Sequence, residues 1–227
     1  MQDFELTPLV FPALPKLPSD GIWMLEQLSR RKGRRAQALL IRQSRFDGDL
    51  VLSDDRVPSS SWYGDRQVEA LICTGDLQIN GDLIDDSSHA KPILIVTGSL
   101  HLRSWLRGGM SAFIGADVRA SGFVVGHYND SALMVGGDLK AAGYLPRARP
   151  YKDCPHIRPH QFGGRIDARE LDVGDIDPQG LREHFDPGVL TEEDGEIYLD
   201  ERAVLSAVRE RRPVWRLAAD RVEQEQV

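Results

Sequence analysis

Between about residues 36 and 145, apolar residues fall in short runs that alternate with polar ones, and these runs recur with a tripeptide. The tripeptide is Gly-Asp-Leu or a close variant, and its copies occupy residues 48–50, 75–77, 98–100, 116–118 and 137–139. Its last residue begins an apolar–any–apolar triplet, as in Leu77-Gln78-Ile79. Alternation with a period of two over a short run predicts a strand with one buried side. We therefore expect a strand directly after each tripeptide.

Two further apolar runs flank most copies of the triplet. Leu71-Ile72-Cys73 precedes one copy, and Leu83-Ile84 follows it. Three short strands per repeat, separated by sharp turns, are typical of a parallel β-helix whose stacked repeats share one interior. An antiparallel β-sandwich also has short strands and regular turns, but it does not explain why one tripeptide recurs with the same neighbours. We expect a mainly β fold, a parallel β-helix (β-solenoid) of about five to seven rungs.

The segments on either side of the repeats have a different pattern. Residues 1–35 contain several prolines and then a helix predicted from Asp20 to Lys32. Near the other end, short helices are predicted from Gln179 to Phe185 and from Glu201 to Arg211. We therefore divide the chain into an N-terminal arm and capping helix (1–35), a β-solenoid (36–176) and a C-terminal helical segment (177–227).

Charge and composition narrow the classes of partner. The net charge of −7 argues against broad nucleic-acid binding, which needs a basic face, and favours a basic protein partner. No apolar run reaches the roughly 18 residues of a membrane span. Residues 1–17 lack the pattern of a secretory signal, so we expect a cytoplasmic protein, a monomer or small homo-oligomer, with no cofactor.

A resemblance to a known family follows from three features: the Gly-Asp-Leu repeats, the loop Gly126–Asp130, and the tail from Asp194 to Val214. Together they resemble bacterial proteins described as polymer-forming cytoskeletal, or bactofilin-like, and their β-helical relatives, over about residues 36–215. The resemblance implies a β-helix and, for true bactofilins, end-to-end polymerisation through bare rungs. The uneven rungs and predicted helical caps of this chain argue against filaments.

Candidate partner-binding residues lie in the predicted loops and on one outward row. His101 occupies the outward place of its triplet, aligned with Gln78, Arg119 and Lys140 on neighbouring repeats. Two acidic pairs in predicted loops, Asp54-Asp55 and Asp85-Asp86, form a predicted binding surface for a basic partner. The candidates for partner binding are Asp54, Asp55, Asp85, Asp86, His101, His127, Tyr128 and Asp130.

Three patterns have a chemical interpretation beside a structural one. His127 with Asp130 has the residue types of a general base and its orienting partner, or of a hydrogen-bonded loop. Cys154, His156 and His160 offer three zinc ligands without a fourth, and the alternative is a loop stiffened by proline. The repeated Asp residues suit calcium, or they cap their own turns. We predict no catalytic residues.

The function that these observations favour is a non-enzymatic β-solenoid protein-binding module. Its most concrete form is a toxin-neutralising, immunity-type protein that binds a basic partner such as a bacterial toxin. The alternative is a self-assembling, bactofilin-like structural scaffold. An enzyme of the polysaccharide lyase kind would need a long groove with clustered acids and bases, for which the short rungs leave little room.

Overall fold

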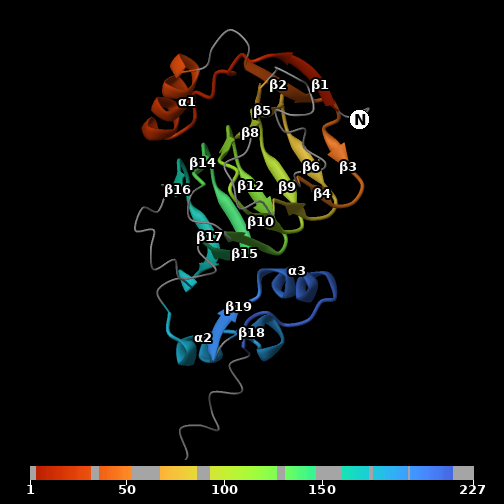
Figure 1. Cartoon of the computed structure of the whole chain (residues 1–227), viewed down its shortest axis with the longest axis vertical. Coiled ribbons are helices and arrows are strands. Elements are labelled where there is room, and N and C mark those ends of the chain that lie inside the picture. The colour runs from red at the N-terminus through yellow and green to blue at the C-terminus, as the bar shows by residue number, and fades with distance from the viewer. Residues whose placement is uncertain are drawn as a thin grey trace, which may run out of the picture.

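The computed structural model describes residues 4–31, 36–52, 67–85, 93–126, 131–146, 160–173, 176–193 and 195–216. This part of the chain is mainly β, as predicted, and most of its strands belong to two sheets (Figure 1). Sheet A has the order β1 (Phe4–Pro8), β2 (Ala36–Ile41), β5 (Gln67–Cys73), β8 (Ile93–Val96), β11 (Ala112–Ile114), β14 (Leu133–Val135) and β16 (His160–Phe162).

Sheet B contains two rows of strands that meet in one long strand, β15 (Leu139–Leu145). The first row is β3 (Arg45–Phe46), β6 (Leu77–Ile79), β9 (Leu100–Leu102) and β12 (Val118–Ala120). The second row is β4 (Leu50–Val51), β7 (Leu83–Ile84), β10 (Trp105–Arg107) and β13 (Phe123–Gly126). β15 pairs with both β12 and β13, and β17 (Ile166–Glu170) pairs with β15.

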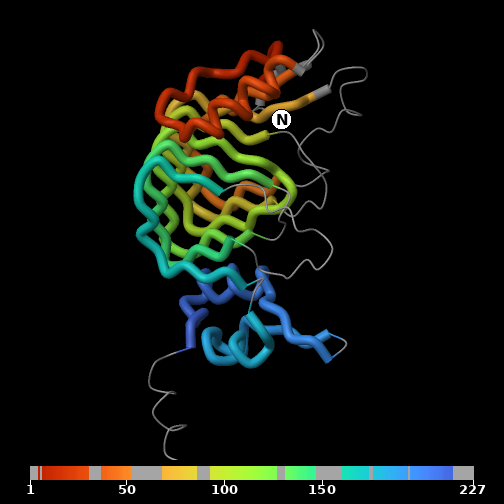
Figure 2. The backbone as a smooth tube through the Cα atoms, turned by 90° about the vertical axis from the view of Figure 1, so that its left-hand side faces the viewer, coloured from red at the N-terminus to blue at the C-terminus, as the bar shows by residue number. Residues whose placement is uncertain are grey.

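From β2 to β17, strands pair in parallel with the equivalent strand of the next repeat. In sheet A, Leu71 is in register with Leu94, and in sheet B, Val118 is in register with both Leu100 and Leu139. Figure 2 shows the chain crossing the same faces again and again, each pass beside the one before. The predicted alternation is confirmed in β6, where Leu77 and Ile79 are buried and Gln78 is exposed. Side chains such as Leu71, Leu77 and Leu83 from three successive strands enter one apolar cluster.

The Asp of the tripeptide joins successive repeats. Asp76 Oδ1 accepts a hydrogen bond from the backbone N–H of Ser99 at 2.7 Å, and Asp138 Oδ1 accepts one from Arg165 at 2.7 Å. Asp117 Oδ1 accepts from Asp138 at 3.0 Å. We expected this side chain to cap its own turn, but it satisfies a backbone donor of the following repeat instead.

The first tripeptide copy, residues 48–50, occupies a different corner from the others. Leu50 pairs with Leu83, not with Leu77, and Asp49 Oδ1 accepts from the N–H of Asp82 at 2.8 Å. Its structural counterpart is therefore residues 81–83, and our alignment of this copy with residues 75–77 was wrong. Both corners need the same sharp turn, so the same short sequence appears at each.

The N-terminal segment covers the outward side of sheet A. Its helix α1 (Ser19–Arg31) agrees closely with the predicted range. Leu14, Leu17 and Leu25 pack in one cluster with outward-facing residues of the sheet, among them Ile72, Ile95, Phe113 and Met134. β1 runs antiparallel to β2 and so covers the edge of sheet A that β2 would otherwise form.

The C-terminal segment packs against the second row of sheet B. It consists of α2 (Pro178–His184), the 3-10 helix η3 (Pro187–Val189), the hairpin of β18 (Leu190–Glu193) and β19 (Glu196–Leu199), and α3 (Glu201–Arg209). The two α-helices were predicted and the hairpin was not. Phe185, Val189 and Val204 share a cluster with Leu106, Phe123 and Val125 of the sheet. Within the described ranges, no helix is long and apolar enough to cross a membrane.

Candidate functional site: an outward groove and a buried polar corner

The structure describes only some of the predicted site residues. Asp85, His101 and His160 lie in the described part of the chain. The others lie outside the described residues, and the hypotheses that rest on them stay predictions: Asp54, Asp55, Asp86, His127, Tyr128, Asp130, Cys154 and His156.

Asp85 follows β7 and has a structural role. It is 2% exposed, and its Oδ2 accepts hydrogen bonds from the backbone N–H groups of Gly108 at 3.1 Å and Met110 at 2.9 Å. A buried carboxylate that satisfies backbone donors cannot contact a partner protein. The prediction that Asp85 belongs to an exposed acidic surface was therefore wrong.

His160 begins β16 and lies in a buried polar corner formed with Arg107, Ser131 and Tyr144. Arg107 ends β10, where Trp105 faces the interior, Leu106 faces outward and Arg107 faces inward again. The Arg107 side chain is 1% exposed, and its Nη1 lies 3.0 Å from His160 Nε2. Its Nη2 donates to the hydroxyl of Ser131 at 3.2 Å.

Both ring nitrogens of His160 have polar neighbours. Nε2 lies 3.0 Å from Arg107 Nη1, which can only donate, and 3.3 Å from the Ser131 carbonyl oxygen, which can only accept. Nδ1 lies 2.6 Å from the Tyr144 hydroxyl, which can do either. Burial and the adjacent Arg107 guanidinium lower the pKa of His160 to about 3, so the ring is neutral at ordinary pH. Burial also lowers the pKa of Arg107 to about 10 and raises the pKa of Tyr144.

A neutral, buried imidazole of this kind is a poor general base, because no substrate can reach it and its proton affinity is low. The described residues also contain no group of three His, Cys, Asp or Glu side chains placed to hold a metal ion. The corner therefore acts as a polar part of the core.

The accessible feature is a groove over the first row of sheet B, which we call the sheet B groove. It is a shallow, open hollow of about 530 Å³. Its polar residues form two columns. Gln78, His101, Arg119 and Lys140 lie at the strand positions of the predicted row, and Asn80, Arg103 and Ser121 lie in the turns that follow. The lining residues are Gln78, Ile79, Asn80, His101, Leu102, Arg103, Arg119, Ala120, Ser121 and Lys140.

The predicted outward row is confirmed by the strand register. Gln78 is opposite His101, His101 is opposite Arg119, and Arg119 is opposite Lys140. The side chains of Arg119 and Lys140 are 60% and 71% exposed. The strand register extends the row to Arg45 at one end and Asp167 at the other.

The groove lining is basic. Its described residues include Arg103, Arg119 and Lys140 as cations and no carboxylate. Five described carboxylates bond to this lining from its margin. Asp117 Oδ2 is 3.0 Å from Arg119 and Asp167 Oδ2 is 3.6 Å from Lys140, Asp47 accepts from Asn80 at 2.8 Å, and Asp49 and Asp82 hold Arg103. Exposed pairs such as those of Arg119 and Lys140 are worth about 0–1 kcal/mol each, so these two cations can change partners at little cost.

An ion-pair network fixes one side of the groove. We call Asp49, Asp82, Arg103 and Arg209 the Asp82 clamp. Arg103 Nε donates to Asp82 Oδ1 at 2.7 Å, and Arg209 Nε donates to Asp82 Oδ2 at 2.6 Å. Both arginines also donate to Asp49, at 3.0 Å and 2.7 Å. The clamp ties α3 to sheet B, and nothing in the sequence pattern pointed to it, because Asp82 and Arg209 are 127 positions apart.

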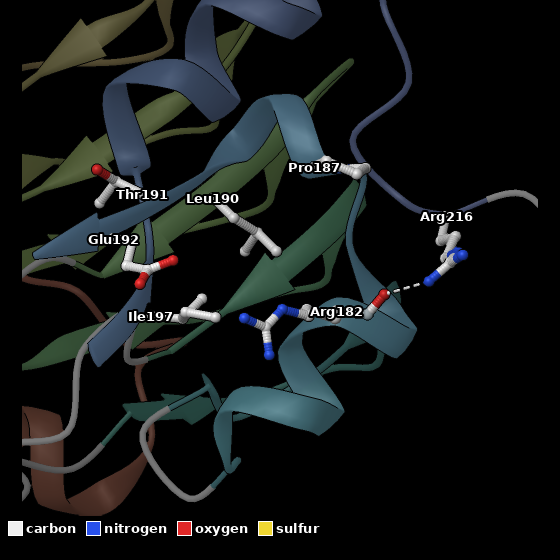
Figure 3. Close-up of a pocket in the computed structure, with 7 residues that line it drawn as sticks. All are labelled: Arg182, Pro187, Leu190, Thr191, Glu192, Ile197 and Arg216. Atoms are coloured by element: carbon white, nitrogen blue, oxygen red, sulfur yellow. Dashed lines mark hydrogen bonds between the residues drawn. The ribbon is translucent and has the colours of Figure 1, made fainter. Parts of the chain in front are cut away.

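A second hollow lies within the C-terminal segment, between α2 and the hairpin (Figure 3). It encloses about 250 Å³, with Pro187, Leu190 and Ile197 as its apolar side chains and Arg182, Glu192 and Arg216 at its polar side. Arg216 Nη1 donates to the carbonyl oxygen of Arg182 at 2.9 Å (Figure 3). The hollow thus combines both signs of charge and has less charge bias than the sheet B groove.

No protein-family model, curated protein or solved structure matches this chain.

Proposed function

We propose that the chain is a non-enzymatic β-solenoid binding protein whose sheet B groove holds an acidic segment of a protein partner. The solenoid interpretation is supported by the parallel pairing of each repeat with the next, from β2 to β17. In this interpretation the repeats are successive turns of one parallel β-helix. Such a scaffold presents the same outward position of each turn as a straight row.

The observation that carries the proposal is the row itself. His101, Arg119 and Lys140 are adjacent across three neighbouring strands, and they face an open groove whose described lining residues include no carboxylate. A partner that brings carboxylates to this row replaces the weak marginal pairs with its own. The amide and hydroxyl groups of Gln78, Asn80 and Ser121 add hydrogen-bonding capacity.

The expected basic partner fits this groove less well than an acidic one. Asp85, the described member of the predicted acidic pairs, is buried. Neutralisation of a bacterial toxin, the immunity-type role, stays a proposal, and it would require the toxin to present an acidic segment to the sheet B groove.

Charge reversal in the groove tests the proposal. We would measure binding of a fluorescein-labelled oligo-glutamate peptide by anisotropy at low salt, for the wild-type chain and for Arg119→Glu/Lys140→Glu. Loss of two exposed contacts of about 0.7 kcal/mol each predicts a tenfold weaker affinity. The matched control is Arg30→Glu/Arg212→Glu, which makes the same change in net charge at two exposed arginines outside the groove lining. Equal losses in both variants would show that only net charge matters and would remove the groove from the proposal.

A structural scaffold is the second candidate, and one feature favours it. Among the described strands, β17 has a partner only on its β15 side, so that end of the stack has an open edge. At the other end, antiparallel β1 covers the edge of sheet A, whereas β3 and β4 of sheet B each have one partner among the described strands. Exposed charges on β17, such as Asp167 and Glu170, discourage edge pairing. Filaments in electron micrographs of concentrated protein would make the scaffold the leading interpretation.

A further inference from the structure

We infer that the segment held in the sheet B groove is an α-helix with a stripe of acidic residues. This inference deepens the proposed function and rests on it. It follows from the direction and spacing of the row His101, Arg119 and Lys140, compared with the repeats of an α-helix and of an extended strand.

The row crosses the strands, so its spacing is the distance between strands. Neighbouring strands lie about 4.8 Å apart, and His101, Arg119 and Lys140 occupy three successive strands. The row from His101 to Lys140 therefore spans about 9.6 Å. A partner that uses all three groups must repeat its carboxylates at a matching interval.

A helix matches this interval and an extended chain does not. Residues on one helix face recur at about 5.4 Å per turn, so two turns advance about 10.8 Å. Residues on one face of a strand recur at about 6.6 Å, so two steps advance about 13 Å. The helical mismatch of about 1 Å is within the reach of flexible Arg and Lys side chains, whereas the extended mismatch of more than about 3 Å accumulates over the row.

The Lys140 end of the row adds a second constraint on the charge pattern of the partner. Beyond Lys140 the register brings Asp167, whose side chain is 74% exposed. A helix lying along the row therefore meets basic groups over successive turns and then an acidic one. The complementary stripe is acidic over three turns and basic at the next, which also orients the helix in the groove.

Two peptides of identical composition test the inference. Both carry the same number of glutamates in an Ala- and Gln-rich background of about 20 residues with blocked ends, so that both are helical. The first spaces its glutamates by alternating steps of three and four residues, one per helical turn, which makes one stripe on the helix. The second places them at every second residue, which makes a stripe only in an extended chain. Affinity is measured by anisotropy, and helix content by circular dichroism.

We expect the first peptide to bind the wild-type chain at least about tenfold more tightly than the second, and to gain helix content on binding. In the Arg119→Glu/Lys140→Glu variant this preference should disappear, while the Arg30→Glu/Arg212→Glu control should retain it. Equal binding of the two peptides, or tighter binding of the second, would overturn the helical inference and leave the acidic-segment proposal standing. Failure of both peptides to bind would overturn both.

Discussion

The Arg107 guanidinium lies 3.0 Å from the His160 imidazole, inside the protein, with no carboxylate hydrogen-bonded to either group among the described residues. A cation beside a titratable base keeps that base neutral. The arrangement makes folding sensitive to acid in a predictable direction.

Stability should fall as pH falls because the unfolded chain binds a proton that folded His160 rejects. The folded pKa of His160 is about 3, against an ordinary value of about 6.5. The contribution of His160 is therefore fully present above about pH 6.5 and is lost progressively toward pH 3, by about 5 kcal/mol in total. Urea unfolding at pH 7, 5.5 and 4.5 measures the trend.

The control for this effect is His160→Gln, which cannot titrate but can still accept from Arg107. We expect the variant to be less stable than the wild type at pH 7, and the difference in unfolding free energy to shrink as the pH is lowered. A difference that stays constant from pH 7 to 4.5 would show that His160 is not the acid-sensitive group.

Replacement of Arg107 separates its charge from its volume. Arg107 Nε has no hydrogen-bond partner among the described residues, so hydrogen bonds do not fully offset the desolvation cost of burying the side chain. We expect Arg107→Met to be more stable than Arg107→Ala by about 2 kcal/mol, because Met fills the space and Ala leaves a cavity. Thermal unfolding of the two variants gives the comparison, and equal stabilities would contradict it.

The Asp82 clamp should show measurable coupling between distant parts of the chain. Asp82 has no exposed side-chain surface, whereas Arg209 is 40% exposed. We expect a double-mutant cycle of Asp82→Asn and Arg209→Gln to give a coupling free energy of about 1–2 kcal/mol. The exposed pair Arg45 and Asp47, with N–O distance 3.4 Å, serves as the control and should give less than about 0.5 kcal/mol.

The hydrogen bonds that the tripeptide Asp makes to the next repeat should stabilise the fold through their acceptor oxygen, and less through the charge of the carboxylate. Asp138→Ala removes the acceptor for Arg165 N–H and should cost about 1–3 kcal/mol of unfolding free energy. Asp138→Asn keeps an oxygen in place and should cost clearly less. If Asn is as damaging as Ala, charge and not hydrogen bonding holds the repeats together.

The local pattern of apolar and polar residues determined the strands, the helices of the N-terminal and C-terminal segments, and the outward row. The period-two alternation around Gln78, His101 and Lys140 dictates which side chains face outward, because a strand turns its residues to alternate sides. The helix α1 could also be predicted from the sequence, because its apolar spacing is a property of a few consecutive residues.

Tertiary structure alone decided the burial of Asp85, the corner occupied by residues 48–50 and the Asp82 clamp. Each depends on which repeat lies next to which, and therefore on the lengths of the connecting segments. A carboxylate is exposed or buried according to the donors around it, and the donors for Asp85 come from the following repeat. Arg209 reaches Asp82 only because α3 packs back onto sheet B, a contact that no local pattern encodes.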